Sequence, residues 1–350
     1  MPSCLKCGAE LPLNEEGMAP VLCDRCAGRA SSRARRRLSA GVMLQFPATS
    51  LLIGINTAVF LGMILSSGSL TSFVGFSDQT LLRWGGNVGP YTLSGEYWRL
   101  VTAGFVHANP LHFAMNMWCL WSLGQLSERL FGSSVTLAIY VLTGVGGAML
   151  SVGLNPLRSE VGASAAVFGI AGAILSGIKF GNVPLASIHK RQIFSSLIFF
   201  VIFNLSFGML PGIDNMAHLG GLISGFLFGA PLAAAAASGK KLMEWGTIVL
   251  AILVLTAAGS RVVQAHGHVS QLRVGGYNIH DRNYPAAISV LQRAAASEPG
   301  DARAHFLLGL AYRGNGQPDN ANMEFERAEQ LDPDPNSIER KIQALFGGSG

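Results

Sequence analysis

The chain has 350 residues, of which 49% are hydrophobic and 13% are charged, and its net charge is +5. Because soluble proteins carry about 25% charged residues, this composition excludes an ordinary soluble protein and places much of the chain in a membrane. The net charge is small for such a length, and we expect no nucleic acid among the partners.

The N-terminal segment, residues 1–30, predicts a zinc ribbon. Two Cys-x2-Cys pairs, fifteen residues apart, are formed by Cys4, Cys7, Cys23 and Cys26. Together they supply four thiolates, which is a ligand set of structural, tetrahedral zinc. A redox role for these cysteines is the weaker alternative, because two pairs at this spacing in a cytoplasmic segment favour a metal. A basic linker, residues 31–47, follows the ribbon.

Seven apolar segments follow, and each is long enough to cross a bilayer as a helix, which takes about 20 residues. They run over residues 48–67, 110–131, 135–154, 162–180, 192–211, 214–235 and 245–263. Many glycines lie within them, and small residues let membrane helices approach one another closely. The pattern predicts an all-α, multi-pass membrane protein.

The basic residues around these segments predict the orientation of the chain. They gather before the first segment, between the fourth and fifth, and between the sixth and seventh. They are Arg33, Arg35, Arg36 and Arg37, then Lys179, Lys190 and Arg191, then Lys240 and Lys241. Because basic loops lie on the cytoplasmic side, we expect a cytoplasmic N-terminus. The loop over residues 68–109 and the region after the seventh segment would then lie outside.

Four polar side chains at the ends of apolar segments are candidates for function, because such groups are costly at membrane depth. They are His112, Asn116, Ser164 and His218. The second, fourth and sixth segments begin at the outer face, and these side chains lie near those beginnings. His112 and Asn116 are four residues apart and therefore share one helix face. We expect all four side chains to converge just below the outer surface.

A serine, a histidine and nearby donors at one depth can carry out acyl transfer. His218 would take the proton of Ser164, whose hydroxyl is a poor nucleophile without a base. Asn116, His112 and the backbone N–H of Ser164 would donate to the oxyanion of the tetrahedral intermediate. Asp214 is the one acid at the outer ends of these segments, so a dyad is favoured over a triad. A lone serine in a membrane helix is usually a packing residue, and only the joint pattern points to catalysis.

Four short motifs occur in order along the apolar region. They are Tyr97-Trp98-Arg99 after the first segment, His107-x4-His112-x3-Asn116 at the second, Gly162-Ala163-Ser164-Ala165 at the fourth, and Ala217-His218-Leu219-Gly220-Gly221 at the sixth. Each resembles the motif that rhomboid intramembrane serine proteases carry at that place. The resemblance is specific, because all four motifs match in order and at the matching helix ends.

The resemblance implies a six-helix protease core over residues 48–235. Within it, Ser164 would be the nucleophile, His218 the general base, and His112 and Asn116 the oxyanion side chains. Such catalysis needs no cofactor. The substrates would be transmembrane proteins cleaved near the outer end of a helix, and the membrane would be the inner membrane of a bacterium.

Further positions follow from the same resemblance. Gly221 and Gly225 would let the sixth helix pack closely on the fourth, and Glu128 matches a structural acidic position of bacterial members. Ala165 departs from the family, because the motif more often has glycine there. Phe168 stands where many members have a tyrosine that packs on the catalytic histidine. Phenylalanine keeps the ring and loses the hydroxyl, so we expect activity to survive.

The C-terminal region, residues 268–347, predicts tetratricopeptide repeats, after an added transmembrane helix over residues 236–263. A 34-residue register fits the repeat signature. The matching residues are Leu308, Gly309, Tyr312, Ala321, Phe325, Ala328 and Pro333, and one repeat earlier Gly275, Ala287, Leu291, Ala294 and Pro299. Ordinary helical hairpins are the weaker alternative. A helix over residues 335–346 would cap the array, which would bind a protein or peptide outside the membrane.

Two other functions are alternatives to a protease. A catalytically inactive rhomboid-like scaffold would bind membrane clients without cutting them, but such proteins usually lack the serine or the histidine, and both are present here. A transporter would have charged residues or broken helices near the middle of the membrane, and these segments offer few. The sequence therefore favours the protease and leaves its substrate open.

Overall fold

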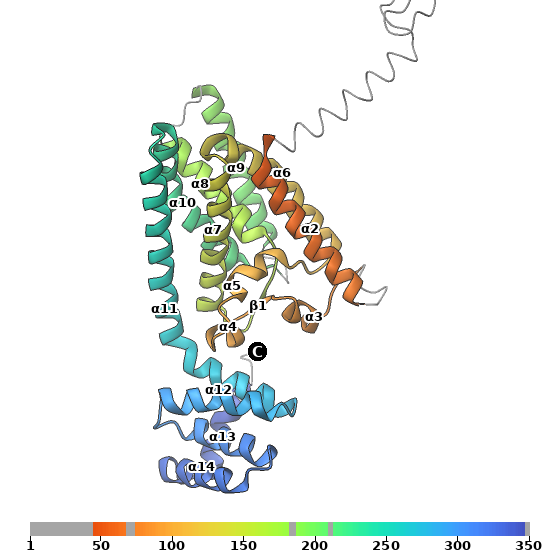
Figure 1. Ribbon diagram of the computed structural model, residues 1–350, viewed down its shortest axis with the longest axis vertical. Helices are drawn as coiled ribbons and strands as arrows, with labels where there is room; N and C mark the ends of the chain where they lie inside the picture. Colours follow the sequence, from red (N-terminus) through yellow and green to blue (C-terminus); the bar gives the residue numbers. More distant parts are fainter. Residues whose placement is uncertain (1–44, 68–73, 182–186, 209–212, 347–350) are drawn as a thin grey trace, which may run out of the picture.

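The structure is a computed structural model, and it describes residues 45–67, 74–181, 187–208 and 213–346. Helices make up most of this part of the chain, in agreement with the all-α prediction. A bundle of long helices occupies one end of the molecule and a group of shorter helices the other, with α11 leading from the first to the second (Figure 1). The four cysteines of the expected zinc ribbon lie outside the described residues, so that site stays a prediction.

In the described part of the chain, each of the seven apolar segments forms a helix. They are α2 (Pro47–Ser67), α6 (Pro110–Phe131), α7 (Ser133–Leu154), α8 (Ser164–Phe180), α9 (Ser187–Phe207), α10 (Asn215–Ser238) and α11 (Lys241–His280). Among the described residues, α2, α7, α10 and α11 are long and apolar enough to cross a membrane, and α8 is a shorter apolar helix. Helices suit this setting because hydrocarbon offers no partner to a free backbone N–H or C=O group.

Helix α8 lies inside the bundle, with almost all of its side chains buried against α6, α7, α9 and α10. Its contact with α10 is especially close because glycines leave no side chain between the two backbones. A Cβ at Gly221 would collide with the carbonyl oxygen of Ala165. One turn later, a Cβ at Gly225 would collide with that of Gly169. The expected close packing at Gly221 and Gly225 is therefore confirmed.

Glu128 of α6 ties the beginning of α2 to the bundle. Its carboxylate accepts hydrogen bonds from the backbone N–H groups of Ala48 (3.2 Å) and Thr49 (2.7 Å). The hydroxyl groups of Thr49 (2.5 Å) and Ser133 (2.6 Å) donate to it as well. The first N–H groups of a helix have no partner within it, so the buried Glu128 satisfies them and holds two helices together. This is a structural role, as expected.

Between α2 and α6 the chain forms a loop of short elements, called the outer loop below. They are α3 (Asp78–Arg83), β1 (Asn87–Val88), α4 (Gly89–Leu93), α5 (Arg99–Thr102) and the 3-10 helix η2 (Ala103–Phe105). Arg99 organises the loop, because its guanidinium donates to the Gly86 carbonyl (3.0 Å) and pairs with Glu96 (2.6 Å). Strand β1 pairs antiparallel with β2 (Ser159–Glu160), which places Asn87 opposite Glu160. The outer loop therefore contacts the segment that leads into α8.

Helix α11 joins the bundle to the C-terminal helices without a break. The sequence predicts a membrane helix that ends at residue 263 and a repeat region that begins at residue 268, but one helix continues from Lys241 to His280. Residues 264–268 include the polar side chains of Gln264, His266 and His268 and contain no proline, so they end the apolar stretch without ending the helix.

Four shorter helices follow α11. They are α12 (Tyr284–Ser297), α13 (Ala302–Gly314), α14 (Pro318–Leu331) and α15 (Pro335–Phe346). Helix α12 packs on α11, and α14 packs on α13. The Leu291 side chain lies against Gly275 in the first pair, and 34 residues later Phe325 lies against Gly309 in the second. The repeated contact agrees with the 34-residue register, while the tetratricopeptide identity of these helices stays a prediction.

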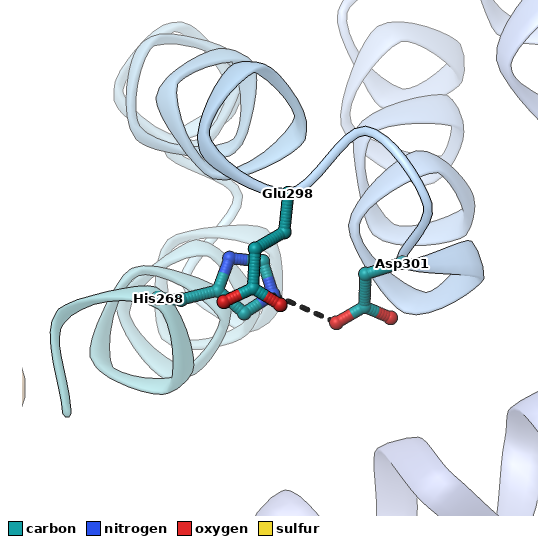
Figure 2. Close-up of side chains that lie close together, drawn as sticks. All are labelled: His268, Glu298 and Asp301. Carbon is teal, nitrogen blue, oxygen red and sulfur yellow. Dashed lines mark hydrogen bonds and ion pairs between the residues drawn. The ribbon is translucent and has the colours of Figure 1, made fainter. Parts of the chain in front are cut away.

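A charged cluster links α11 to the turn between α12 and α13 (Figure 2). His268 Nε2 lies 2.7 Å from Asp301 Oδ2 and 3.6 Å from Glu298 Oε2. The Arg303 guanidinium donates to both carboxylate oxygens of Asp301. Burial opposes ionisation of Asp301, but the hydrogen bonds from Arg303 and His268 outweigh it and lower its pKa to about 2. The cluster therefore fixes the turn between α12 and α13 to α11.

The C-terminal helices and the end of α11 also touch the outer loop. Arg293 Nη2 donates to the Ser94 carbonyl at 3.3 Å, and the rings of Tyr91 and Tyr277 stack with their centroids 6.4 Å apart. Both contacts involve α4 or the residue that follows it. The outer loop therefore lies between the bundle and the C-terminal helices and contacts both.

Candidate active site

Ser164 and His218 meet at the ends of two packed helices. Ser164 is the first residue of α8, and His218 lies in the first turn of α10. Ser164 Oγ and His218 Nε2 are 2.8 Å apart, which is the distance of a hydrogen bond. The structure thus brings together the two residues that the sequence pairs as nucleophile and base.

The turn before Ser164 has a conformation that favours glycine. Gly162 has a φ of +113°, which L residues rarely adopt, and its N–H donates to the Ala103 carbonyl at 2.9 Å. A Cβ at this position would also lie 2.6 Å from Nε2 of His112. Gly162 is therefore needed for its backbone conformation and for space, and it lets the turn lie directly against α6.

His112 and Asn116 bring α6 to the same place. The Asn109 side chain caps this helix by accepting from the His112 N–H at 2.8 Å. Asn116 lies one turn further, and its Nδ2 donates to the His112 carbonyl at 2.9 Å. The same Nδ2 would lie 3.7 Å from a Cβ at Gly162. Three helices thus converge as the sequence predicts, with the two side chains of α6 beside the turn that precedes Ser164.

Asp214 caps α10 and does not orient His218. Its Oδ1 accepts from the N–H groups of Met216 (3.0 Å) and Ala217 (3.3 Å), and its Oδ2 accepts from the Ser151 hydroxyl. Within the described part of the chain, Nδ1 of His218 has no hydrogen-bond partner. This geometry matches the expected dyad better than a triad with Asp214.

Phe168 packs on the ring of His218. The two ring centroids are 4.5 Å apart and the planes differ by 10°, which is a stacked pair. Phe200 of α9 packs on Phe168 in turn, at 5.5 Å between centroids. The aromatic residue one turn after Ser164 therefore holds the imidazole in place, as the resemblance implies, without a tyrosine hydroxyl.

His107 supports the turn before Ser164, a role that the sequence motif leaves open. It is fully buried, and its Nε2 lies 3.5 Å from the backbone nitrogen of Ala163. Its Nδ1 lies 3.3 Å from the Phe105 carbonyl oxygen. An Nδ1–H tautomer fits both contacts, because it donates to the carbonyl and accepts from the amide. Its place in the motif, five residues before His112, is the sequence signal for this role.

A buried polar pair beside the same turn, Asn87 and Glu160, cannot be recognised as a pair from the sequence. Asn87 Nδ2 donates to Glu160 Oε2 at 2.7 Å, and the Thr92 hydroxyl donates to Asn87 Oδ1 at 2.5 Å. Asn87 and Glu160 are 73 residues apart along the chain. The only local signal is an acidic residue four positions before Ser164.

Comparison with known proteins gives one family. The rhomboid domain matches residues 94–235. Rhomboid protease GluP of Bacillus subtilis is 30% identical over 301 residues, which are 85% of this chain and 57% of that protein. RHOMBOID-like protein 4 of Arabidopsis thaliana is 40% identical over 157 residues, 45% of this chain and 39% of that protein. Rhomboid protease AarA of Providencia stuartii is 30% identical over 218 residues, 56% of this chain and 75% of that protein.

This chain covers different shares of the lengths of the three relatives. The chain covers less than two thirds of GluP and of the Arabidopsis protein, and three quarters of AarA. The matched residues run from before α6 to the last turn of α10 and include both Ser164 and His218. Together with the long apolar helices of the bundle, the matches show that this chain belongs to the rhomboid family and is a multi-pass integral membrane protein.

Proposed function

We propose that this protein is an intramembrane serine endopeptidase that hydrolyses peptide bonds in or near the transmembrane segments of other proteins. The observation that carries the proposal is the 2.8 Å contact between Ser164 Oγ and His218 Nε2, made across the closely packed ends of α8 and α10. The names of GluP and AarA describe those two relatives as proteases. A serine next to an imidazole inside a membrane protein of this family favours the same class of reaction here.

The reaction follows from the chemistry of this pair. Ser164 Oγ attacks the carbonyl carbon of the client while its proton passes to Nε2 of His218. The tetrahedral intermediate then collapses, the C–N bond breaks, and His218 gives the proton to the leaving amine. Water, losing a proton to the same imidazole, attacks the acyl ester and releases the second product with the free Ser164 hydroxyl.

The negative charge of the intermediate needs donors, and α6 and α8 supply candidates. The backbone N–H of Ser164 lies at the start of α8, where the helix dipole favours an anion. Asn116 Nδ2 and the His112 ring lie beside the preceding turn. We assign these groups to the oxyanion because they flank the nucleophile, the backbone N–H at the start of α8 and the two side chains at the N-terminal end of α6.

The inactive scaffold is the weaker alternative. It requires a missing or displaced catalytic group, whereas Ser164 and His218 are both present and within hydrogen-bond distance. A client-binding role also gives no reason for Phe168 to hold the imidazole in a fixed orientation.

Labelling with a fluorophosphonate tests the proposal, because this reagent phosphonylates a serine that a base has activated. We expect the folded wild-type protein to label, Ser164→Ala to lose labelling, and His218→Ala to label roughly 10²–10⁴-fold more slowly, which is the contribution of general acid–base catalysis. Ser195→Ala, which removes an exposed serine of α9, is the matched control and should label like wild type. Equal labelling of Ser164→Ala, or no labelling of folded wild type, would contradict the proposal.

The two ends of the chain have their own proposed roles. The repeated Gly275–Leu291 and Gly309–Phe325 contacts support a tetratricopeptide array that binds a protein or peptide. The basic residues near the cytoplasmic ends of the expected segments support an outer position for this array and a cytoplasmic position for the N-terminus. The cysteine spacing supports a structural zinc ion at the N-terminus, whereas catalysis by the dyad itself needs no cofactor.

A further inference from the structure

Glu160 is a buried acid close to the dyad that the reaction described above does not use. Its residue exposure is 6%, and it lies in β2, four residues before Ser164. The structure gives its carboxyl group one hydrogen bond, at 2.7 Å, from Nδ2 of Asn87. Asn87 is itself fully buried and is held by the Thr92 hydroxyl. The Glu160 carboxyl group therefore faces Asn87 of the outer loop in a buried contact.

The surroundings of Glu160 favour the neutral carboxyl. Burial is the largest cause and raises its pKa, the Asn87 hydrogen bond partly offsets this, and the negative charge of Asp214 adds to it, so that the pKa lies at about 8. The nearby cations are engaged elsewhere: Arg158 donates to the Ile213 carbonyl at 2.5 Å, and Arg99 pairs with Glu96. At neutral pH the carboxyl is therefore mostly protonated.

The geometry connects Glu160 to both halves of the dyad. The pairing of β2 with β1 fixes the chain at Glu160, two residues before Gly162. The N–H of Gly162 is itself anchored to the Ala103 carbonyl. Only Val161 lies between these two anchors, so a shift of β2 would be passed directly to the turn that places Ser164. On the other side, Asp214 caps the helix that carries His218.

An ionised Glu160 would disturb both connections. A carboxylate in an apolar site is strongly disfavoured unless it is paired, and here the charge that acts on it is that of another acid, Asp214. Repulsion between the two, and the entry of water to solvate the new charge, would loosen the β1–β2 contact. The Ser164 turn and the start of α10 would then lose their fixed positions.

We propose, on the basis of the protease function proposed above, that Glu160 is a positioning residue whose neutral carboxyl group, bonded to Asn87, holds the turn before Ser164 in its reactive position. Ionisation of this one group then switches the dyad from an ordered to a disordered arrangement. The expected sign of this role is a loss of activity at alkaline pH. The ionisation of Glu160 causes this loss, and not a titration of Ser164 or His218.

The test measures the rate of fluorophosphonate labelling of the full-length protein in micelles between pH 6 and pH 10. For wild type we expect the rate at pH 9 to be about a tenth of that at pH 7, because one unit above a pKa of about 8 leaves about a tenth of the molecules protonated. Glu160→Gln stays neutral at every pH and accepts the same hydrogen bond, so its rate should not fall over this range.

Asp78→Asn is the matched control. It makes the same change from carboxyl to amide in the outer loop, but at an exposed residue, and should keep the alkaline loss of wild type. Glu160→Ala cannot accept the Asn87 hydrogen bond and should label slowly at every pH. An equal alkaline loss in wild type and Glu160→Gln would overturn the inference, and so would a flat wild-type profile.

Thermal unfolding supplies a second measurement that does not depend on catalysis. The unfolded chain loses the Glu160 proton near pH 4.3, whereas the folded chain keeps it up to about pH 8. Between these pH values the folded state binds more protons, so wild type loses stability as the pH rises. The midpoint of Glu160→Gln should therefore rise relative to that of wild type from pH 5 to pH 8. A constant difference would contradict the buried neutral acid.

The outcomes separate this inference from the protease function. A folded wild type that labels at no pH contradicts the protease function, while the stability measurement still reports on Glu160. A wild type that labels, with the same pH profile as Glu160→Gln, contradicts only the positioning role. If Glu160→Gln fails to fold, the wild-type profile and the Asp78→Asn control still decide whether an alkaline loss near pH 8 exists.

Discussion

Among single residues, the orientation of the His218 ring matters most for the chemistry, because only one of its nitrogens faces Ser164. No acid among the described residues is bonded to the ring, since Asp214 is engaged in capping α10. The orientation depends instead on the stacked ring of Phe168, which α9 supports through Phe200. The imidazole of His218 is oriented by packing and not by a third, hydrogen-bonded residue. Its orientation is therefore sensitive to the loss of an aromatic ring.

Phe168→Ala should therefore slow fluorophosphonate labelling without changing the nucleophile. An aromatic pair contributes roughly 0.5–1.5 kcal/mol beyond its buried area, which corresponds to roughly a two- to tenfold lower rate. Phe168→Tyr keeps the ring and should label at about the wild-type rate. Wild-type labelling by Phe168→Ala would show that the ring does not orient His218, provided that circular dichroism shows both variants folded.

The sequence was sufficient to find the four side chains that converge, and insufficient to find what supports them. Ser164, His218, His112 and Asn116 are polar groups at the starts of apolar helices, so hydropathy alone places them at one depth. Glu160 and Asn87 meet through a pair of two-residue strands, which have no periodicity and join positions 73 residues apart. Contacts of that kind depend on the folded outer loop, and no local pattern encodes them.

At the level of helices, the contact between α8 and α10 carries the dyad. Both backbones approach closely because Gly221 and Gly225 face carbonyl groups of α8. The glycine pattern predicts this contact. The continuity of α11 is different, because a polar stretch such as residues 264–268 indicates the end of a membrane segment but carries no information on whether the helix stops.

Gly225→Ala should separate α8 from α10, because its Cβ has no room beside the Gly169 carbonyl. Overpacking of this kind costs typically about 1–3 kcal/mol, so we expect a lower thermal midpoint and weaker labelling of Ser164. Gly246→Ala is the matched control, because its Cβ on α11 would meet no atom of the described residues within 4 Å. It should unfold and label like wild type, and equal effects of the two substitutions would contradict the role of close packing.

At the scale of the whole molecule, the outer loop contacts both the helix bundle and the C-terminal helices. It pairs with the segment before Ser164 through β1, and α4 bears the Tyr91 ring that stacks on Tyr277 at the end of α11. The C-terminal helices are thus held beside the outer loop, and the His268–Asp301 cluster joins them to α11 (Figure 2). This arrangement suits the proposed capture of clients outside the membrane.

Cleavage in a lipid bilayer tests the central claim most directly. The full-length protein would be reconstituted into liposomes with single-span model proteins that carry helix-weakening glycine and proline residues near the outer end of their membrane segment. We predict that wild type and Ser195→Ala cut these proteins into two fragments, while Ser164→Ala and His218→Ala leave them intact. Fragments produced equally by Ser164→Ala, or a folded wild type that cuts none of the model proteins, would contradict a serine endopeptidase built on Ser164 and His218.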